Sequence, residues 1–157
     1  SAVPSLDEVL EMVDGRVPVL IEVKPCNSVI AAGKELARTA RTYPGPVAVQ
    51  AFDPRMLLWL RMRLPGMMRG QLSGSFYGIG LHRSLIFLLR GMFLNALTAP
   101  DFLAFEVEAM PSRFVALWRK ALRAPLLLWT VRSVEQLDFA RRCGANVIFE
   151  GFLPQPK

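Results

Sequence analysis

The sequence predicts an α/β fold with parallel strands, and it favours an incomplete (β/α)8 barrel of about six strands and six helices. Short apolar runs, which are typical of strands covered on both faces, alternate with amphipathic helical segments. No Gly-x-Gly-x-x-Gly sequence follows any of these runs, so a dinucleotide-binding fold is unsupported. A doubly wound sheet fits the alternation as well. The barrel is favoured because barrel enzymes carry their chemistry at strand ends, where polar residues gather here: Glu22, Gln50, Glu106, Thr130 and Glu150.

Length and composition indicate a single domain over residues 1–157, because a chain with 52% apolar residues can bury a substantial core. The net charge is +6, but the basic residues are scattered near helix ends, where cations complement the helix dipole. We therefore expect solvated helix faces and no nucleic-acid partner, with peripheral membrane contact as the alternative.

Two cysteines, Cys26 and Cys143, are too few for a disulfide scaffold, which indicates a reducing, cytoplasmic compartment.

In the first half of the chain, capping residues mark the start of each helix. Ser5 and Glu8 have the spacing of a capping box. Asn27 or Ser28 can cap the next helix, and Asp53 directly precedes a proline, which is a strong helix start. The elements expected here are strands at 17–24 and 47–52 and helices at about 5–14, 28–41 and 54–64.

The second half continues the alternation. We expect 81–97 to form one heavily buried helix, with a membrane-surface helix as the alternative because Arg90 lies beside an apolar run. Another helix follows Ser112. Ser133 and Gln136 form a second capping box, and Gly144 ends that helix. The strands expected are a weaker one within 69–77 and others at 102–108, 125–131 and 146–150.

Glu22 and Lys24 form the first candidate site. They are two residues apart on a strand, so they point to the same side. If that side is the barrel interior, the pair suits a divalent cation held by the carboxylate, with the lysine against a phosphate oxygen. A simple ion pair at the end of a strand explains the same spacing equally well.

Three further candidates for site residues are a second pair of acidic residues, a tryptophan and a histidine. Glu106 and Glu108 repeat the two-residue spacing, so they either hold a cation or share a proton, unless one is a solvated loop residue. Trp129 ends a strand and either lines a pocket or belongs to the core. His82 is the only histidine, and at a helix start it suits a structural role better than general acid/base catalysis. No cysteine and histidine cluster has zinc spacing.

Four segments occur in an order and spacing that resemble one enzyme family. They are a helix opening at 4–10, a Glu-x-Lys strand at 20–24, a strand at 49–53, and closing strands at 128–131 and 144–152. Together they resemble the glycerophosphodiester phosphodiesterases, with Ala51 where the family usually has serine. The resemblance covers essentially the whole chain.

This resemblance implies a barrel of the phospholipase C-like phosphodiesterase type that hydrolyses glycerophosphodiesters to an alcohol and glycerol 3-phosphate. It also implies a divalent metal, Ca²⁺ or Mg²⁺, held by carboxylates. Glu22 matches the metal-binding glutamate of the family and Lys24 matches its phosphate-contacting lysine. Trp129 matches a tryptophan near the pocket, and with Lys24 and Glu106 it completes the phosphate- or substrate-binding residues that we expect.

The sequence departs from the family in its first strands. The His-Arg-Gly strand, the Glu-Asn step, the Glu-x-Asp strand and the His-Asp step do not occur, so we expect the chain to begin after the second barrel strand. Both catalytic histidines would then be missing, and we expect no catalytic residue and no activity from this portion alone. Open barrel edges predict a homo-oligomer or pairing with a missing N-terminal segment. The alternative function is a non-catalytic module that binds a partner or an anionic membrane.

Overall fold

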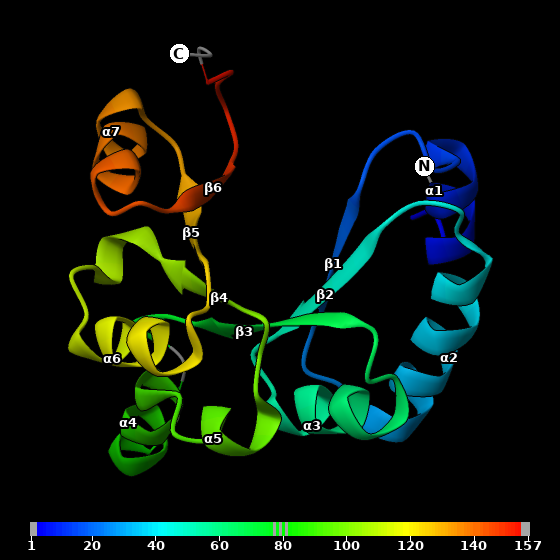
Figure 1. The fold of residues 1–157 in the computed structure, drawn as a ribbon, viewed down its shortest axis with the longest axis horizontal. Helices are drawn as coiled ribbons and strands as arrows, with labels where there is room; N and C mark the ends of the chain where they lie inside the picture. The colour runs from blue at the N-terminus through cyan, green and yellow to red at the C-terminus, as the bar shows by residue number, and fades with distance from the viewer. Residues whose placement is uncertain (1–2, 77, 79, 81, 155–157) are drawn as a thin grey trace. The chain divides into compact units, whose positions relative to one another are not determined.

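The computed structural model describes residues 3–76, 78, 80 and 82–154, and the chain divides into two compact units (Figure 1). The N-terminal unit is Ser1–Arg69 and the C-terminal unit is Gly70–Lys157. Strands alternate with helices in both units, as the sequence predicts. Residue 77 of the strand expected within 69–77, and residue 81 of the helix expected at 81–97, lie outside the described residues.

The N-terminal unit has the five elements that the sequence predicts for this half of the chain. Its two strands are parallel and pair in register from Val19 with Val47 to Val23 with Ala51. The elements are α1 (Leu6–Val13), β1 (Val19–Val23), α2 (Val29–Thr42), β2 (Val47–Ala51) and α3 (Pro54–Arg63).

The predicted caps start the three helices of this unit. Ser5 and Glu8 form both hydrogen bonds of a capping box at α1. Ser28, not Asn27, caps α2, since its hydroxyl accepts from the Ala31 amide at 3.2 Å. Asp53 caps α3 by accepting from the Arg55 amide at 2.9 Å.

A contact between α2 and α3 explains a glycine within a helix. A Cβ added at Gly33 would lie 2.6 Å from the ring of Trp59, which is closer than such atoms approach. Gly33 therefore lets the two helices pack closely, at the usual cost of glycine in a helix. The core that they cover consists of Leu36, Val49, Ala51, Met56, Leu57 and Leu60.

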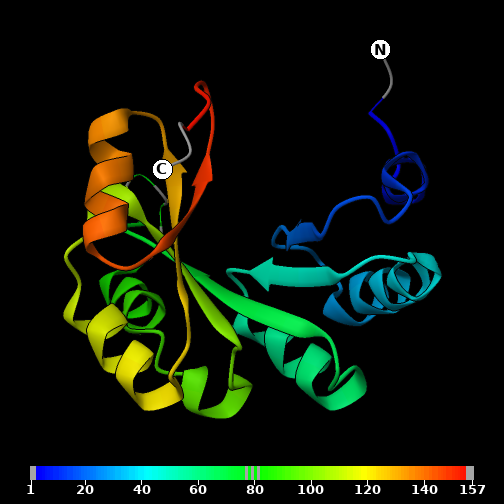
Figure 2. The same cartoon turned by 45° about the horizontal axis from the view of Figure 1, so that its top comes forward.

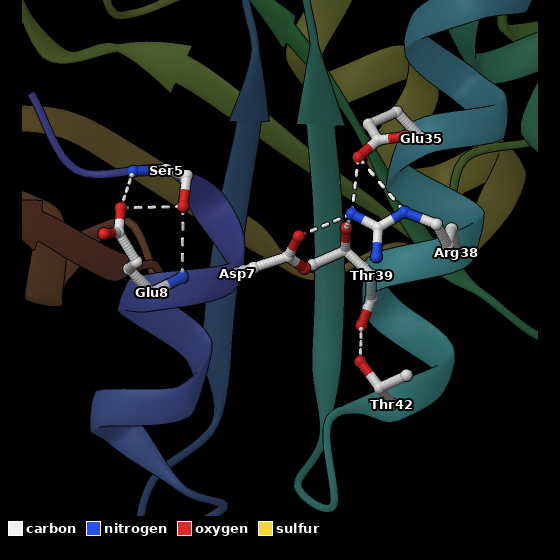
Figure 3. Close-up of polar contacts among 7 residues, drawn as sticks. All are labelled: Ser5, Asp7, Glu8, Glu35, Arg38, Thr39 and Thr42. Atoms are coloured by element: carbon white, nitrogen blue, oxygen red, sulfur yellow. Dashed lines mark hydrogen bonds and ion pairs between the residues drawn. The ribbon is translucent and has the colours of Figure 1, made fainter.

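Arg38 of α2 links the N-terminal helices (Figure 3). Its guanidinium donates to the carboxylates of Asp7 on α1 and Glu35 on α2. These hydrogen bonds hold the pKa values of Asp7 and Glu35 below the ordinary carboxyl range. All three side chains are exposed, so the network adds little free energy but joins α1 to α2 at a defined place.

The C-terminal unit contains the parallel pairs β3–β4, β4–β5 and β5–β6, and the first two residues of β3 precede the unit. Helices α6 and α7 pack on one side of these strands (Figures 1 and 2). The elements are β3 (Met68–Ser73), α4 (Arg83–Gly91), α5 (Asn95–Thr98), β4 (Phe102–Glu106), a 3₁₀ turn (Val107–Ala109), α6 (Arg113–Leu122), β5 (Leu126–Val131), α7 (Val134–Arg142) and β6 (Asn146–Phe149).

Helix α7 begins and ends close to where the sequence predicts. The Ser133 hydroxyl accepts from the Gln136 amide, but the Gln136 side chain accepts from the Arg132 amide, so the capping box is incomplete. At the other end, Gly144 has φ of +59°. Its amide bonds the Arg141 carbonyl and the next amide bonds the Ala140 carbonyl, which is a Schellman motif.

Two expectations about the C-terminal unit are wrong. The helix predicted at 81–97 is two helices, α4 and α5, because Met92 takes a left-handed conformation with φ of 50°. Helix α4 is not heavily buried, since Gly91 is its only buried residue. The strand predicted at 102–108 ends at Glu106, where the chain turns into the 3₁₀ helix.

No helix within the described residues has both the length and the apolar character needed to cross a membrane. Cys26 and Cys143 are both free thiols.

Asp53→Ala is expected to lower the free energy of unfolding of the N-terminal unit by about 1–2 kcal/mol, because α3 loses its N-cap. Urea unfolding followed by circular dichroism measures this change. Asp53→Asn is the matched control, since asparagine caps equally well but carries no charge.

The pH dependence of the same comparison has a defined sign. The Arg55 guanidinium holds the pKa of Asp53 below its usual range. The charge of Asp53 therefore stabilises the fold above the ordinary carboxyl pKa, and this contribution disappears as pH falls through the lowered value. Asp53→Asn should lose less stability than the wild type in that acidic range. An equal loss in both proteins would show that this charge contributes nothing.

Candidate functional site

The structure brings Glu22 and Lys24 together at the C-terminal end of β1. The Lys24 Nζ atom lies 2.7 Å from Glu22 Oε1, so the two side chains form an ion pair. The Lys24 side chain is 77% exposed and that of Glu22 is 28% exposed. Exposed pairs of this kind contribute about 0–1 kcal/mol, so a ligand can separate them at little cost.

Gln50 adds an oxygen to the same edge. It pairs in register with Glu22 across the parallel strands, so both side chains lie on one face of β1 and β2. Gln50 is 5% exposed, and none of the described residues hydrogen-bonds to its Oε1 atom. A buried oxygen without a partner costs roughly 1–3 kcal/mol, which a bound cation or donor would recover. Sequence reasoning noted Gln50 as a polar strand end but gave it no role.

These donors fit part of a metal site. Mg²⁺ and Ca²⁺ prefer carboxylate and amide oxygens, and Mg²⁺ commonly keeps waters and phosphate oxygens as its other ligands. Glu22 and Gln50 supply one oxygen donor group each. Within the described part of the chain, no group of three or more His, Cys, Asp or Glu residues could hold a metal ion.

Glu106 and Trp129 form a second pair of candidate residues, in the C-terminal unit. Glu106 ends β4, whereas Trp129 lies within β5, two residues before its end and not at its end as the sequence predicts. The two residues are in register, so they share one face. The Glu106 carboxylate accepts a hydrogen bond from the Ser75 amide at 2.6 Å. Gly74 permits this approach, because a Cβ there would lie 2.7 Å from the carboxylate. The register that joins Glu106 to Trp129 was not visible in the sequence.

Glu108 does not lie on the same strand as Glu106. It lies in the 3₁₀ turn, and its carboxylate accepts from the Gln136 side-chain amide at 3.1 Å. Each of the two glutamates therefore has its own partner, and Glu108 is the exposed loop residue that the sequence indicated as the alternative to a shared site.

His82 caps α4. Its Nδ1 atom lies 2.8 Å from Ser84 Oγ and accepts weakly from the Ser84 amide at 3.4 Å. The imidazole thus takes the structural role that the sequence favours for it.

The fold is that of known phosphodiesterases. A phosphodiesterase of Oleispira antarctica in complex with sn-glycerol-3-phosphate matches with a TM-score of 0.72 at 14% identity, over 93% of this chain and 56% of that one. Glycerophosphodiester phosphodiesterases of Parabacteroides distasonis (TM-score 0.69, 14% identity) and Thermotoga maritima (0.65, 18%) match over 93% of this chain and 59% of each of those. No family model and no curated protein matches the sequence.

The chain spans little more than half the length of these solved structures. Its α/β fold, with six strands in its described residues, corresponds to part of the glycerophosphodiester phosphodiesterase fold. This confirms the predicted fold class and the resemblance from which it was partly inferred.

Proposed function

We propose that this chain forms one side of a phosphodiester-binding site of the glycerophosphodiester phosphodiesterase kind. Glu22 supplies a carboxylate ligand to a divalent cation, Mg²⁺ or Ca²⁺, and Lys24 contacts the phosphate. The observation that carries the proposal is the grouping of Glu22, Lys24 and the unpartnered oxygen of Gln50 at the ends of β1 and β2. The bound glycerol phosphate in the Oleispira antarctica structure supports the choice of ligand.

The placement of these groups suits their roles. In (β/α) barrels the C-terminal ends of the strands carry the binding and catalytic residues. The Lys24 ammonium is a mobile point charge that matches a phosphate oxygen. A cation, when bound, would neutralise part of the phosphate charge. Glu22 would then exchange its contact with Lys24 for the cation, which leaves the ammonium to the phosphate.

In this proposal, hydrolysis requires an acid and a base that the residues of this sequence do not supply. The sequence contains one histidine, and His82 caps α4. We therefore propose binding without turnover: the chain holds the phosphate, and an intact enzyme would supply the acid and base. Incubation with glycerophosphocholine and Mg²⁺ should release no choline above the buffer rate.

The binding test uses sn-glycerol 3-phosphate in calorimetric titrations with and without Mg²⁺. Lys24→Met is expected to weaken binding roughly tenfold or more, because a charged hydrogen bond is lost. Glu22→Gln is expected to remove the dependence on Mg²⁺.

Lys34→Met and Glu11→Gln are the matched controls, since both side chains are exposed in the same unit and lie away from the strand ends. If Lys24→Met and Lys34→Met bind the ligand equally well, Lys24 is only the partner of an ion pair and the proposal fails.

A further inference from the structure

Helix α4 and the segment after it expose large apolar side chains. Phe87 is 59% exposed and Leu97 is 58% exposed. Four neighbours are also more than a third exposed: Leu85, Leu88, Phe93 and Leu94. We call these six residues the α4 surface. Burying a leucine or phenylalanine fully is worth about 1.5–3 kcal/mol, so such a cluster of exposed side chains marks a contact site.

A basic cavity of about 840 Å³ adjoins the α4 surface. It lies between α4 and the start of α6, and Arg83, Arg90 and Arg113 line it. Aromatic rings form its apolar side: the centroid of the Phe87 ring is 5.8 Å from that of Phe114. The cavity therefore places positive charge directly beside exposed aromatic surface.

The fold itself does not explain these arginines. None of them forms an ion pair with a described residue, whereas Arg38, Arg55 and Arg132 all do. Arg83 and Arg113 are the first residues of α4 and α6, where a cation opposes the helix dipole. Both positions therefore cost local stability.

The C-terminal unit, to which the α4 surface belongs, carries most of the net charge. Residues 70–157 contain 10 basic and 6 acidic residues, so this unit has a net charge of 10 − 6 = +4 out of the total of +6. No acidic residue occurs among residues 70–100. Such a unit attracts an anionic partner.

Other partners fit this surface less well. A longer barrel adds strands beside β1 or β6, the ends of the strand order, whereas α4 joins β3 to β4. A second copy in a two-fold dimer would place the same arginines against one another, because that interface is self-complementary. An anionic bilayer offers both phosphate and apolar surface in one partner.

We propose that the α4 surface docks on bilayers that contain anionic phospholipids. The six apolar side chains enter the interfacial region, and Arg83, Arg90 and Arg113 bind headgroup phosphates at the cavity. Because no described helix is long and apolar enough to span a bilayer, the contact is peripheral. The surface shares no residue with the Glu22 site, so the two proposals stand or fall separately.

Co-sedimentation with vesicles tests this inference. Wild-type protein should bind vesicles of phosphatidylglycerol mixed with phosphatidylcholine, and should bind pure phosphatidylcholine far more weakly. Arg83→Gln/Arg113→Gln should weaken binding roughly 20- to 30-fold, at about 1 kcal/mol for each arginine. Arg123→Gln/Arg142→Gln is the matched control, because it has the same net charge and alters exposed positions away from the cavity.

Phe87→Ser supplies a test of the apolar contact. It should weaken binding to the mixed vesicles even at high salt, where arginine contacts are screened. Circular dichroism should show the helix content unchanged, since Phe87 is largely exposed.

Three results would overturn the proposal. One is equal binding by the two double-arginine variants. Another is full competition by soluble sn-glycerol 3-phosphate at the headgroup concentration, which would indicate a site for a free anion. The third is a wild-type dimer, detected by light scattering, that Phe87→Ser dissociates, because a second copy would then cover the surface.

Discussion

Phe105→Ala is expected to lower the free energy of unfolding of the C-terminal unit by about 3–5 kcal/mol. Phe105 lies on β4, is 1% exposed, and belongs to the main cluster of buried residues of that unit. Truncation removes the transfer free energy of the ring and leaves a cavity that strands on both sides of β4 cannot easily collapse to fill. Urea unfolding followed by the fluorescence of Trp118 and Trp129 measures the loss.

Phe149→Ala is the control for this prediction. The same ring is removed from β6, but Phe149 is 43% exposed, so the expected loss is about 1 kcal/mol or less. Similar losses in the two variants would contradict the burial that the structure assigns to Phe105.

Leu57→Ala is expected to destabilise the N-terminal unit by about 2–5 kcal/mol. Leu57 lies on α3, is fully buried, and packs in the cluster with Met56 and Leu60. Trp59, the only tryptophan among residues 1–69, reports the unfolding of this unit by its fluorescence.

Met62→Ala on the same helix is the control, because the Met62 side chain is 64% exposed. Its expected loss is within about 0.5 kcal/mol. A large effect at Met62 with a small one at Leu57 would mean that α3 presents the opposite face to the core.

The same pair of core variants tests the single domain predicted for residues 1–157. If the chain unfolds as one cooperative domain, Leu57→Ala shifts the transitions reported by Trp59 and by Trp118 and Trp129 equally. If the two units unfold independently, Leu57→Ala shifts only the Trp59 transition and Phe105→Ala only the other. Single-tryptophan variants separate the signals.

The candidate site was partly predictable. The spacing of Glu22 and Lys24 implies a common side, and the structure places their charged atoms 2.7 Å apart. Two neighbours could not be found from spacing. Gln50 reaches Glu22 through the register of β1 and β2, and Trp129 reaches Glu106 through that of β4 and β5. Register between strands depends on how distant segments pack, and no local pattern encodes it.

The sequence alone determined where most helices begin and which runs become strands. Ser5, Ser28, Asp53 and Ser133 cap the helices that follow them because each cap acts within three residues. Only the tertiary structure decided burial and pairing. An apolar run predicts a heavily buried helix at 81–97, but Phe87 and Leu88 of α4 stay exposed because the described elements cover them only in part. A local pattern specifies an apolar face, whereas burial of that face depends on a partner elsewhere in the chain or outside it.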